Sequence, residues 1–143
     1  MTDYHYTEKL DLERTDYQYL QTLAYELKGT VRRSDWLEAL ESGKYSQFRG
    51  AICDDARAPE SFCCLGVAAV LAKLPFYLNG ARMDSKDAGL LIEGMTEKDC
   101  DMFAIPLNDG AREIPLEADP RFNKGATFPE IAAFFRQRWD MPK

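Results

Sequence analysis

The sequence lacks the features that mark several large classes of protein. No apolar run approaches the roughly 20 residues that a transmembrane helix needs. The first residues are polar and acidic, without the basic start and apolar segment of a secretory signal peptide. The glycines are scattered, so neither a GxGxxG nor a GxxxxGK[S/T] phosphate loop occurs. We therefore expect a cytosolic protein that has no membrane segment and no cofactor.

Basic residues are also fewer than acidic residues. The 143 residues include 18 lysines and arginines against 24 aspartates and glutamates, which gives a net charge of −6. An acidic chain gains no counterion release on a phosphate backbone, so we expect no direct binding of nucleic acid. The acidity favours either a basic partner or simple solubility. Because arginines are interspersed among the acids, the pattern is not typical of a nucleic-acid mimic.

Histidine is nearly absent, and the four cysteines have the wrong spacing for a metal site. His5 is the only histidine, and none of the cysteines forms a CxxC pair; they are Cys53, Cys63, Cys64 and Cys100. Adjacent cysteines rarely chelate one zinc ion together, so we predict no metal site. Cys53 and Cys63 could face each other across a hairpin, but a disulfide would not persist in a reducing compartment.

What the chain does contain is typical of one folded domain. Hydrophobic residues make up 45% of it and aromatic residues 12%. A chain of this length can bury a core without disulfides or bound metals. There is no internal repeat and no linker rich in Gly, Ser or Pro. Residues 1–15 lack periodicity and are expected to form an N-terminal arm, and residues 16–143 a single α+β domain.

Hydrophobic periodicity and capping residues predict most of the helices. They are expected near residues 16–27, 35–42, 64–74, 96–103 and 127–139. The last of them opens with a capping box formed by Thr127 and Glu130. The helix after Cys64 is apolar on nearly every side, so we expect it to be the central, buried helix.

The segment between residues 45 and 63 predicts a small antiparallel β-hairpin packed on that central helix. Phe48, Gly50 and Ile52 alternate with other residues as in one strand, DDARAPE is typical of a turn, and SFC would be the returning strand. Residues 76–95 mix turn residues with one apolar patch. Residues 105–126, with three prolines, predict a long loop. The expected architecture is a mainly helical α+β fold.

Cys63 and Cys64 stand where the hairpin meets the central helix, and they are the candidate catalytic residues. Free N–H groups and the positive dipole end of a helix lower the pKa of a thiol, and papain-like hydrolases place their nucleophile in this way. Such an enzyme also needs a base, normally His, and His5 lies on the expected arm. The alternative is a pair of small apolar residues packed at a helix start. We favour this alternative, and with it a protein that is not an enzyme.

A second set of polar residues is the candidate ligand- or partner-binding site. Tyr45, Gln47 and Arg49 alternate along the expected strand and would share one of its faces. Guanidinium and amide groups suit the recognition of phosphate or carboxylate. Asn108 and Asp109 lie at an expected turn. The alternatives are a solvated strand face for the first three residues and an Asx turn for the other two.

Four motifs follow one another in a fixed order. They are WLEALESGKYSQFRGA from Trp36, FCCLGVAAVLA from Phe62, LND from Leu107 and TFPEIAAFF from Thr127. Together they resemble a group of small bacteriophage and prophage proteins with W-x-x-A-L-x-S-G-x-Y-x-Q-x-x-G, Y-C-C-L-G-V, L-N-D and F-x-E-I-A blocks. The resemblance covers residues 35–72 and 107–135. In this chain Phe62 replaces the usual tyrosine, and a long insert precedes Phe128.

The resemblance implies a phage setting and no particular reaction. We therefore expect a phage-encoded, non-enzymatic accessory protein, located in the host cytoplasm, that binds and inhibits a host protein. Such an inhibitor would act in anti-defence or host takeover. The alternatives are a sponge for a small anionic nucleotide signal held by arginines such as Arg49, a hydrolase that uses Cys63 or Cys64, and a minor virion or replication factor. The sequence leaves a homo-oligomer open.

Overall fold

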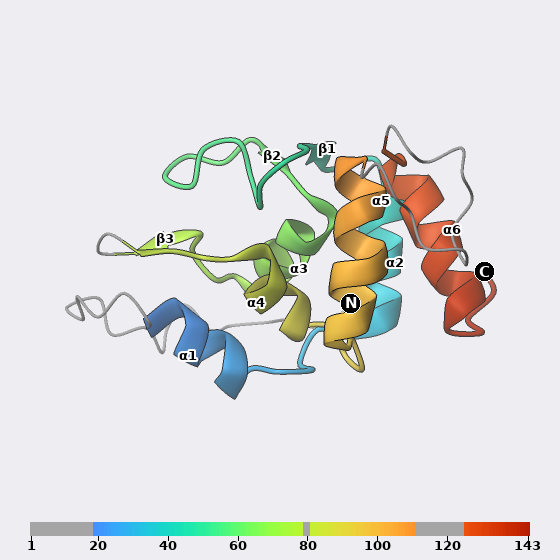
Figure 1. Cartoon of the computed structure of the whole chain (residues 1–143), viewed down its shortest axis with the longest axis horizontal. Helices are drawn as coiled ribbons and strands as arrows, with labels where there is room; N and C mark the ends of the chain where they lie inside the picture. Colours follow the sequence, from blue (N-terminus) through green and yellow to red (C-terminus); the bar gives the residue numbers. More distant parts are fainter. Residues whose placement is uncertain (1–18, 79–80, 111–124) are drawn as a thin grey trace.

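The computed structural model of the chain describes residues 19–78, 81–110 and 125–143, which form the expected mainly helical α+β fold (Figure 1). The expected arm, residues 1–15, lies outside the described residues. The elements in chain order are α1 (Tyr19–Glu26), α2 (Arg33–Glu41), β1 (Ser46–Gln47), β2 (Ser61–Phe62), α3 (Cys64–Ala72), β3 (Tyr77–Leu78), β4 (Ala81–Arg82), α4 (Ser85–Leu90), the π-helix η2 (Asp99–Ala104), α5 (Ile105–Asp109) and α6 (Phe128–Arg138).

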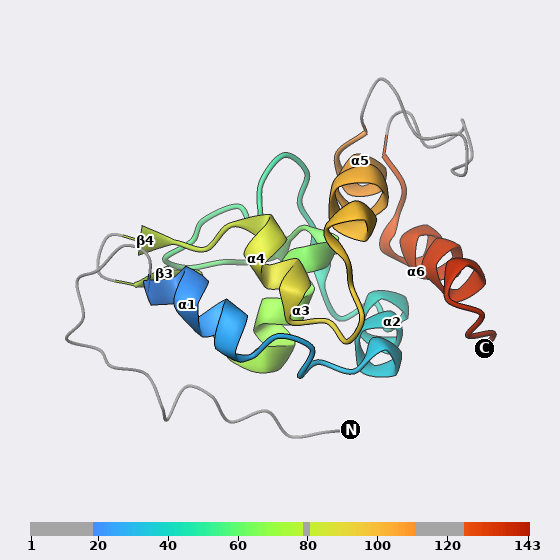
Figure 2. The ribbon, with the colours of Figure 1, turned by 60° about the horizontal axis from the view of Figure 1, so that its bottom comes forward.

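Helix α3 is the centre of the fold, as its apolar sequence predicts. All of its residues except Val70 and Leu71 are buried, and it packs against both α2 and α4. In Figures 1 and 2, α1 lies beside α4 and α6 lies beside α2. The helices therefore follow one another in space in the order α1, α4, α3, α2, α6, and the core runs through this row.

Two residues explain the close fit around α3. Trp36 of α2 is fully buried, and its indole N–H donates a hydrogen bond of 2.8 Å to the carbonyl oxygen of Cys64. Gly66 has no side chain, and a Cβ at this position would collide with the carbonyl oxygen of Ile52. A glycine is needed here because another stretch of backbone passes directly over the helix.

Helix α6 begins at the predicted capping box. The Thr127 hydroxyl accepts a hydrogen bond from the Glu130 backbone N–H at 3.3 Å, and the Glu130 carboxylate accepts one from the Thr127 N–H at 3.0 Å. The helix then places aromatic rings on Trp36, with centroid distances of 5.3 Å for Phe135 and 5.8 Å for Trp139. These rings join α6 to α2 through apolar packing.

The strands are short, and the predicted hairpin is present only in part. Cys53 forms an antiparallel bridge with Phe62 across the expected turn. Ser46 and Gln47, however, pair with β2 in parallel. The prediction of one continuous strand is wrong here because the chain turns at Gly50, whose φ is 99°. Strands β3 and β4 form an antiparallel hairpin in a segment for which the sequence predicted no strand.

The region before residue 111 is more helical than its prolines indicate. The π-helix η2 leads directly into α5, where a loop was expected. Pro106 lies in the first turn of α5, directly after the π-helix, where the hydrogen-bonding pattern of the helix changes. Gly110, with φ at 79°, ends the helix. The loop prediction is therefore wrong over residues 105–109, and residues 111–124 lie outside the described residues.

Candidate functional site

Four of the five predicted binding residues lie together around the side chain of Asn108, which is fully buried in α5. Its Oδ1 accepts hydrogen bonds from Gln47 Nε2 at 3.0 Å and from the Cys64 backbone N–H at 3.1 Å. Its Nδ2 donates to the Phe48 carbonyl oxygen and to Asp109 Oδ1, both at 2.9 Å. Both lone pairs and both N–H groups of the amide are thus used within the protein.

The neighbours of Asn108 are held by similar bonds. Gln47 and Arg49 both donate to the carbonyl oxygen of Ala126, at 2.8 and 3.1 Å. Asp109 Oδ1 also accepts a hydrogen bond from the Gly50 N–H at 2.9 Å. These contacts join β1, α5 and the segment before α6, so the four residues have a structural role. A ligand-binding role for them stays a prediction.

Tyr45 does not join this cluster. Its ring packs edge-on against Phe62, with the centroids 6.2 Å apart. It also lines a separate pocket of about 240 Å³ next to α2. Sequence alternation placed Tyr45 on the same strand face as Gln47 and Arg49, but β1 has only two residues, so that face does not reach it.

The two candidate catalytic cysteines are enclosed at the start of α3. Cys63 is 5% exposed and Cys64 is fully buried, with its sulfur 3.5 Å from the carbonyl oxygen of Ala104. Burial is the main cause that raises the pKa of both thiols, and it raises the pKa of Cys64 far. A thiol must lose its proton to act as a nucleophile. The surroundings of both residues therefore oppose a hydrolase mechanism.

Cys63 acts as the N-cap of α3. Its sulfur accepts a hydrogen bond from the Gly66 N–H at 3.2 Å, and the Ser85 hydroxyl lies 3.8 Å from the same sulfur. Serine, threonine, aspartate and asparagine are the usual residues at this position. Cys63 therefore takes the place of a serine, which accounts for one of the two cysteines.

All four cysteines are buried free thiols. Burial is also the main cause that raises the pKa of Cys100 to about 12. Within the described part of the chain, no group of three or more His, Cys, Asp or Glu residues is placed to hold a metal ion. Likewise, no helix among the described residues is long and apolar enough to cross a membrane.

A groove between α1, α4 and η2 is a surface that the sequence analysis missed. Tyr25 of α1 is 62% exposed and lines this groove, whose volume is about 180 Å³. Asp84, Asp87 and Glu97 also line it. We call this surface the Tyr25 groove. The helical periodicity of α1 could have predicted that Tyr25 is exposed, because Tyr25 falls outside the apolar stripe and an aromatic ring there faces solvent.

The Tyr25 groove is acidic. The basic residue in its lining, Lys86, forms an ion pair with Asp101 at 3.2 Å. Burial, followed by the neighbouring Asp84 carboxylate, raises the pKa of Asp87. A cation that entered the groove would relieve this repulsion and could lie against the exposed ring. The groove therefore favours a positively charged group beside an aromatic contact.

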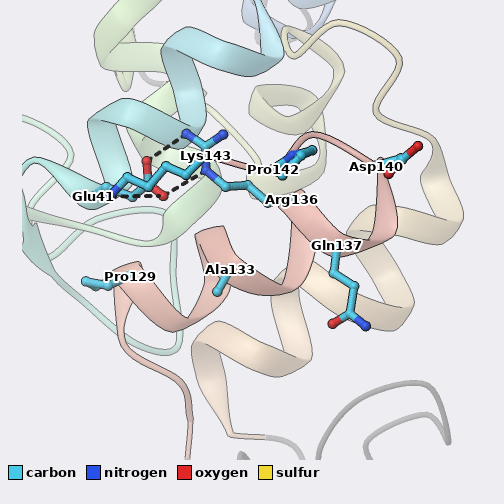
Figure 3. A pocket seen from close by; sticks show the side chains of 8 residues that line it. All are labelled: Glu41, Pro129, Ala133, Arg136, Gln137, Asp140, Pro142 and Lys143. Carbon is cyan, nitrogen blue, oxygen red and sulfur yellow. Dashed lines mark hydrogen bonds and ion pairs between the residues drawn. The ribbon is translucent and has the colours of Figure 1, made fainter.

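A wider pocket, of about 630 Å³, lies between α2 and α6 near the last residue (Figure 3). Arg136 donates two hydrogen bonds of 2.8 Å to the Glu41 carboxylate and one of 3.0 Å to the Met141 carbonyl oxygen. The bonds from Arg136 are the main cause that lowers the pKa of Glu41. Lys143 lies beside the pair. Because Arg136 and Glu41 neutralise each other, this pair serves to fix α6 on α2.

Comparison of the chain with known proteins finds no match. Neither protein-family models, nor curated proteins, nor solved structures match it. The function of the chain must therefore be inferred from its own surfaces and sequence motifs.

Proposed function

We propose that the chain is a non-enzymatic accessory protein of a phage or prophage that binds a host protein and inhibits it. The order of the four sequence motifs supports the phage setting. The enclosed, protonated thiols support binding over cysteine catalysis. The Tyr25 groove is the surface through which we propose that the host protein is bound, and the cytoplasm of the host cell is the expected location.

The observation that carries this proposal is the exposure of Tyr25. A tyrosine ring that is 62% exposed leaves apolar area in contact with water. Tyrosine is also among the residues most enriched at the energetic centres of protein interfaces. A flanking row of acids suits the rim of such an interface, where charge governs orientation and association rate.

The acidic charge of the groove indicates which kind of surface the partner must present. Asp84, Asp87 and Glu97 line the same groove as the ring, and Lys86 is already paired with Asp101. The complementary surface is a patch of lysine or arginine with an apolar contact for the ring. A basic host protein, such as one that itself handles nucleic acid, has this chemistry. The chain would then compete with the anion that the host protein normally binds.

Capture followed by titration tests this proposal. The tagged chain is incubated with a lysate of host cells, and a protein that it retains is purified and titrated by calorimetry. Tyr25→Ser should weaken the affinity about tenfold or more, as expected for a central interface residue. Asp87→Asn should weaken it less and should reduce its dependence on salt.

Glu26→Gln is the matched control. Glu26 is exposed on the same helix and does not line the groove, so its loss changes the net charge alone. The proposal predicts that this variant binds like the unchanged chain. Equal affinity of the Tyr25→Ser variant, with its fold intact by circular dichroism, would show that the host protein binds elsewhere and would overturn the assignment of the groove.

A further inference from the structure

A further pocket, of about 370 Å³, lies where the turn before β2, the end of α3 and strand β3 meet. Phe62, Val70 and Phe76 form part of its lining, and Phe62 and Phe76 are stacked with their centroids 5.6 Å apart. The volume falls within the range of small-molecule sites, which are mostly apolar with a few placed polar groups. We call this the Arg57 pocket. It is separate from the Tyr25 groove and shares no residue with it.

The charged residues that line the Arg57 pocket are both basic. They are Arg57 and Lys73, both exposed at its edge. None of the described residues in this lining is an acid, although the whole chain carries a net charge of −6. Two cations beside an apolar floor suit an anion that also has an apolar portion.

Arg57 is held in place by Tyr77. Its guanidinium carbon lies 4.7 Å from the centre of the Tyr77 ring, and Nη2 lies 3.1 Å from the Tyr77 hydroxyl. A guanidinium group has several N–H donors in a rigid fork that matches phosphate and carboxylate. A side chain already fixed on a ring loses less entropy when it binds a ligand.

Two acids of the turn that carries Arg57, Asp54 and Asp55, accept hydrogen bonds that shape this turn. Asp55 Oδ1 accepts a hydrogen bond of 3.0 Å from the Arg57 backbone N–H. Asp54 Oδ1 accepts hydrogen bonds from the N–H groups of Glu60 and Ser61, at 3.0 and 3.1 Å. These bonds to Asp54 are also the main cause that lowers the pKa of its carboxyl group. These hydrogen bonds fix the conformation of the turn, and the turn places Arg57 at the pocket.

We propose that the Arg57 pocket binds a small anion that carries a flat ring, of the chemical class of a nucleoside monophosphate. The phosphate would lie between Arg57 and Lys73, and the ring would cover the apolar floor. This site goes beyond the proposed binding of a host protein. It also differs in position from Arg49, whose guanidinium group donates to the Ala126 carbonyl oxygen in the Asn108 cluster.

Calorimetric titration of the full chain with AMP tests the site, with adenosine and inorganic phosphate as the two partial ligands. AMP should bind more tightly than either part, because the floor and the two cations act together. Arg57→Ala should weaken AMP binding by roughly tenfold or more, the size expected for a charge-assisted hydrogen bond. Arg57→Lys should restore part of the affinity, since it keeps the charge but loses the fork.

Two further variants make the outcome decisive. Lys73 has φ at 58°, and asparagine tolerates this conformation, so Lys73→Asn removes the charge without new backbone strain and should also weaken binding. Arg32→Ala removes an arginine that does not line the pocket and should leave binding unchanged. Absence of AMP binding at millimolar concentration, or equal binding by the Arg57→Ala variant with its melting temperature unchanged, would overturn the proposal.

Discussion

At the scale of single residues, the polar side chains that stand out in the sequence lie close together because they bind one another. Asn108 is the clearest case, since its amide satisfies groups from β1, α3 and α5 at once. Buried polar groups need such partners because burial without them is costly. The polar residues that suggest ligand recognition in the sequence form, in the fold, a hydrogen-bond network that holds β1, α3 and α5 together.

Replacement of Asn108 by leucine should therefore be severe. The change removes the acceptor for the buried Cys64 N–H and the donor to the half-buried Phe48 carbonyl oxygen. It also removes one of the two acceptors of Gln47 Nε2, which keeps its bond to the Ala126 carbonyl oxygen. We expect a loss of about 3 kcal/mol in the free energy of unfolding, measured by urea denaturation. Gln137→Ala, at an exposed amide, should change it by less than about 0.5 kcal/mol. A loss of similar size in both variants would contradict the role given to Asn108.

Cys63 offers a second prediction, because its sulfur caps a helix. Cys63→Ala removes the acceptor for the Gly66 N–H and should lower the free energy of unfolding by about 1 kcal/mol. Cys63→Ser supplies a better acceptor and should be at least as stable as the unchanged protein. Thermal melting of the two variants decides the matter. A serine variant less stable than the alanine variant would mean that the position requires an apolar sulfur and no cap.

At the scale of elements, the backbone crossing at Gly66 sets the position of α3. Helix propensity alone predicts that Gly66→Ala stabilises the helix by about 1 kcal/mol. The added Cβ would meet the Ile52 carbonyl oxygen, which itself accepts a hydrogen bond of 2.9 Å from the Cys63 N–H. Backbone cannot move aside as a side chain can, so the destabilisation from this collision should exceed the gain in helix propensity.

We therefore expect Gly66→Ala to lower the free energy of unfolding by about 1–3 kcal/mol, as overpacked core sites do. Chemical denaturation of the purified variant measures this directly. Gly43→Ala is the comparison, because space around Gly43 is open and only its φ of 75° opposes a side chain. A Gly66→Ala variant more stable than the unchanged protein would show that the segment around Ile52 can move.

The ion pair between α2 and α6 should make stability depend on pH. Arg136 holds the pKa of Glu41 below its usual 4.5, so the folded state favours the ionised carboxylate. Its contribution is complete above pH 4.5 and is lost as the pH falls through the lowered pKa. Glu41→Gln should cost about 1 kcal/mol at neutral pH.

Denaturation of both proteins across the acidic range tests the pair. The two stability curves should approach each other as the pH falls below 4.5. Glu26→Gln, which removes an exposed carboxylate on α1, should show no such convergence. A constant difference between the Glu41→Gln variant and the unchanged protein at every pH would contradict a role for charge in this contact.

The sequence predicted correctly the elements that are determined by residues close together in the chain. The capping box at Thr127 and the central, buried position of the apolar helix α3 are confirmed. The strand pairing was partly wrong, because Gly50 reverses the chain and pairing depends on distant partners. Residues 105–109 were predicted as loop from their proline, yet Pro106 falls where a helix tolerates it.

At the scale of the whole molecule, the surfaces open to partners were the least predictable part. The composition gave the net acidity but not its distribution. The fold gathers acids beside Tyr25 and leaves two cations beside an apolar floor at the Arg57 pocket. Each surface draws residues from separate segments of the chain, so no sequence motif marks it. The helical spacing of α1 contains a signal for the exposure of Tyr25, but the position of the acids beside it depends on the fold.

We propose that the chain inhibits a host target by binding and not by a reaction. Titrating the purified target with the chain, while following the target's own activity, tests this most directly. Inhibition by binding should be complete at equimolar amounts, should not grow with incubation time, and should require higher concentrations of the Tyr25→Ser variant. Complete inactivation by a small fraction of an equivalent, increasing with time, would show turnover and contradict the account.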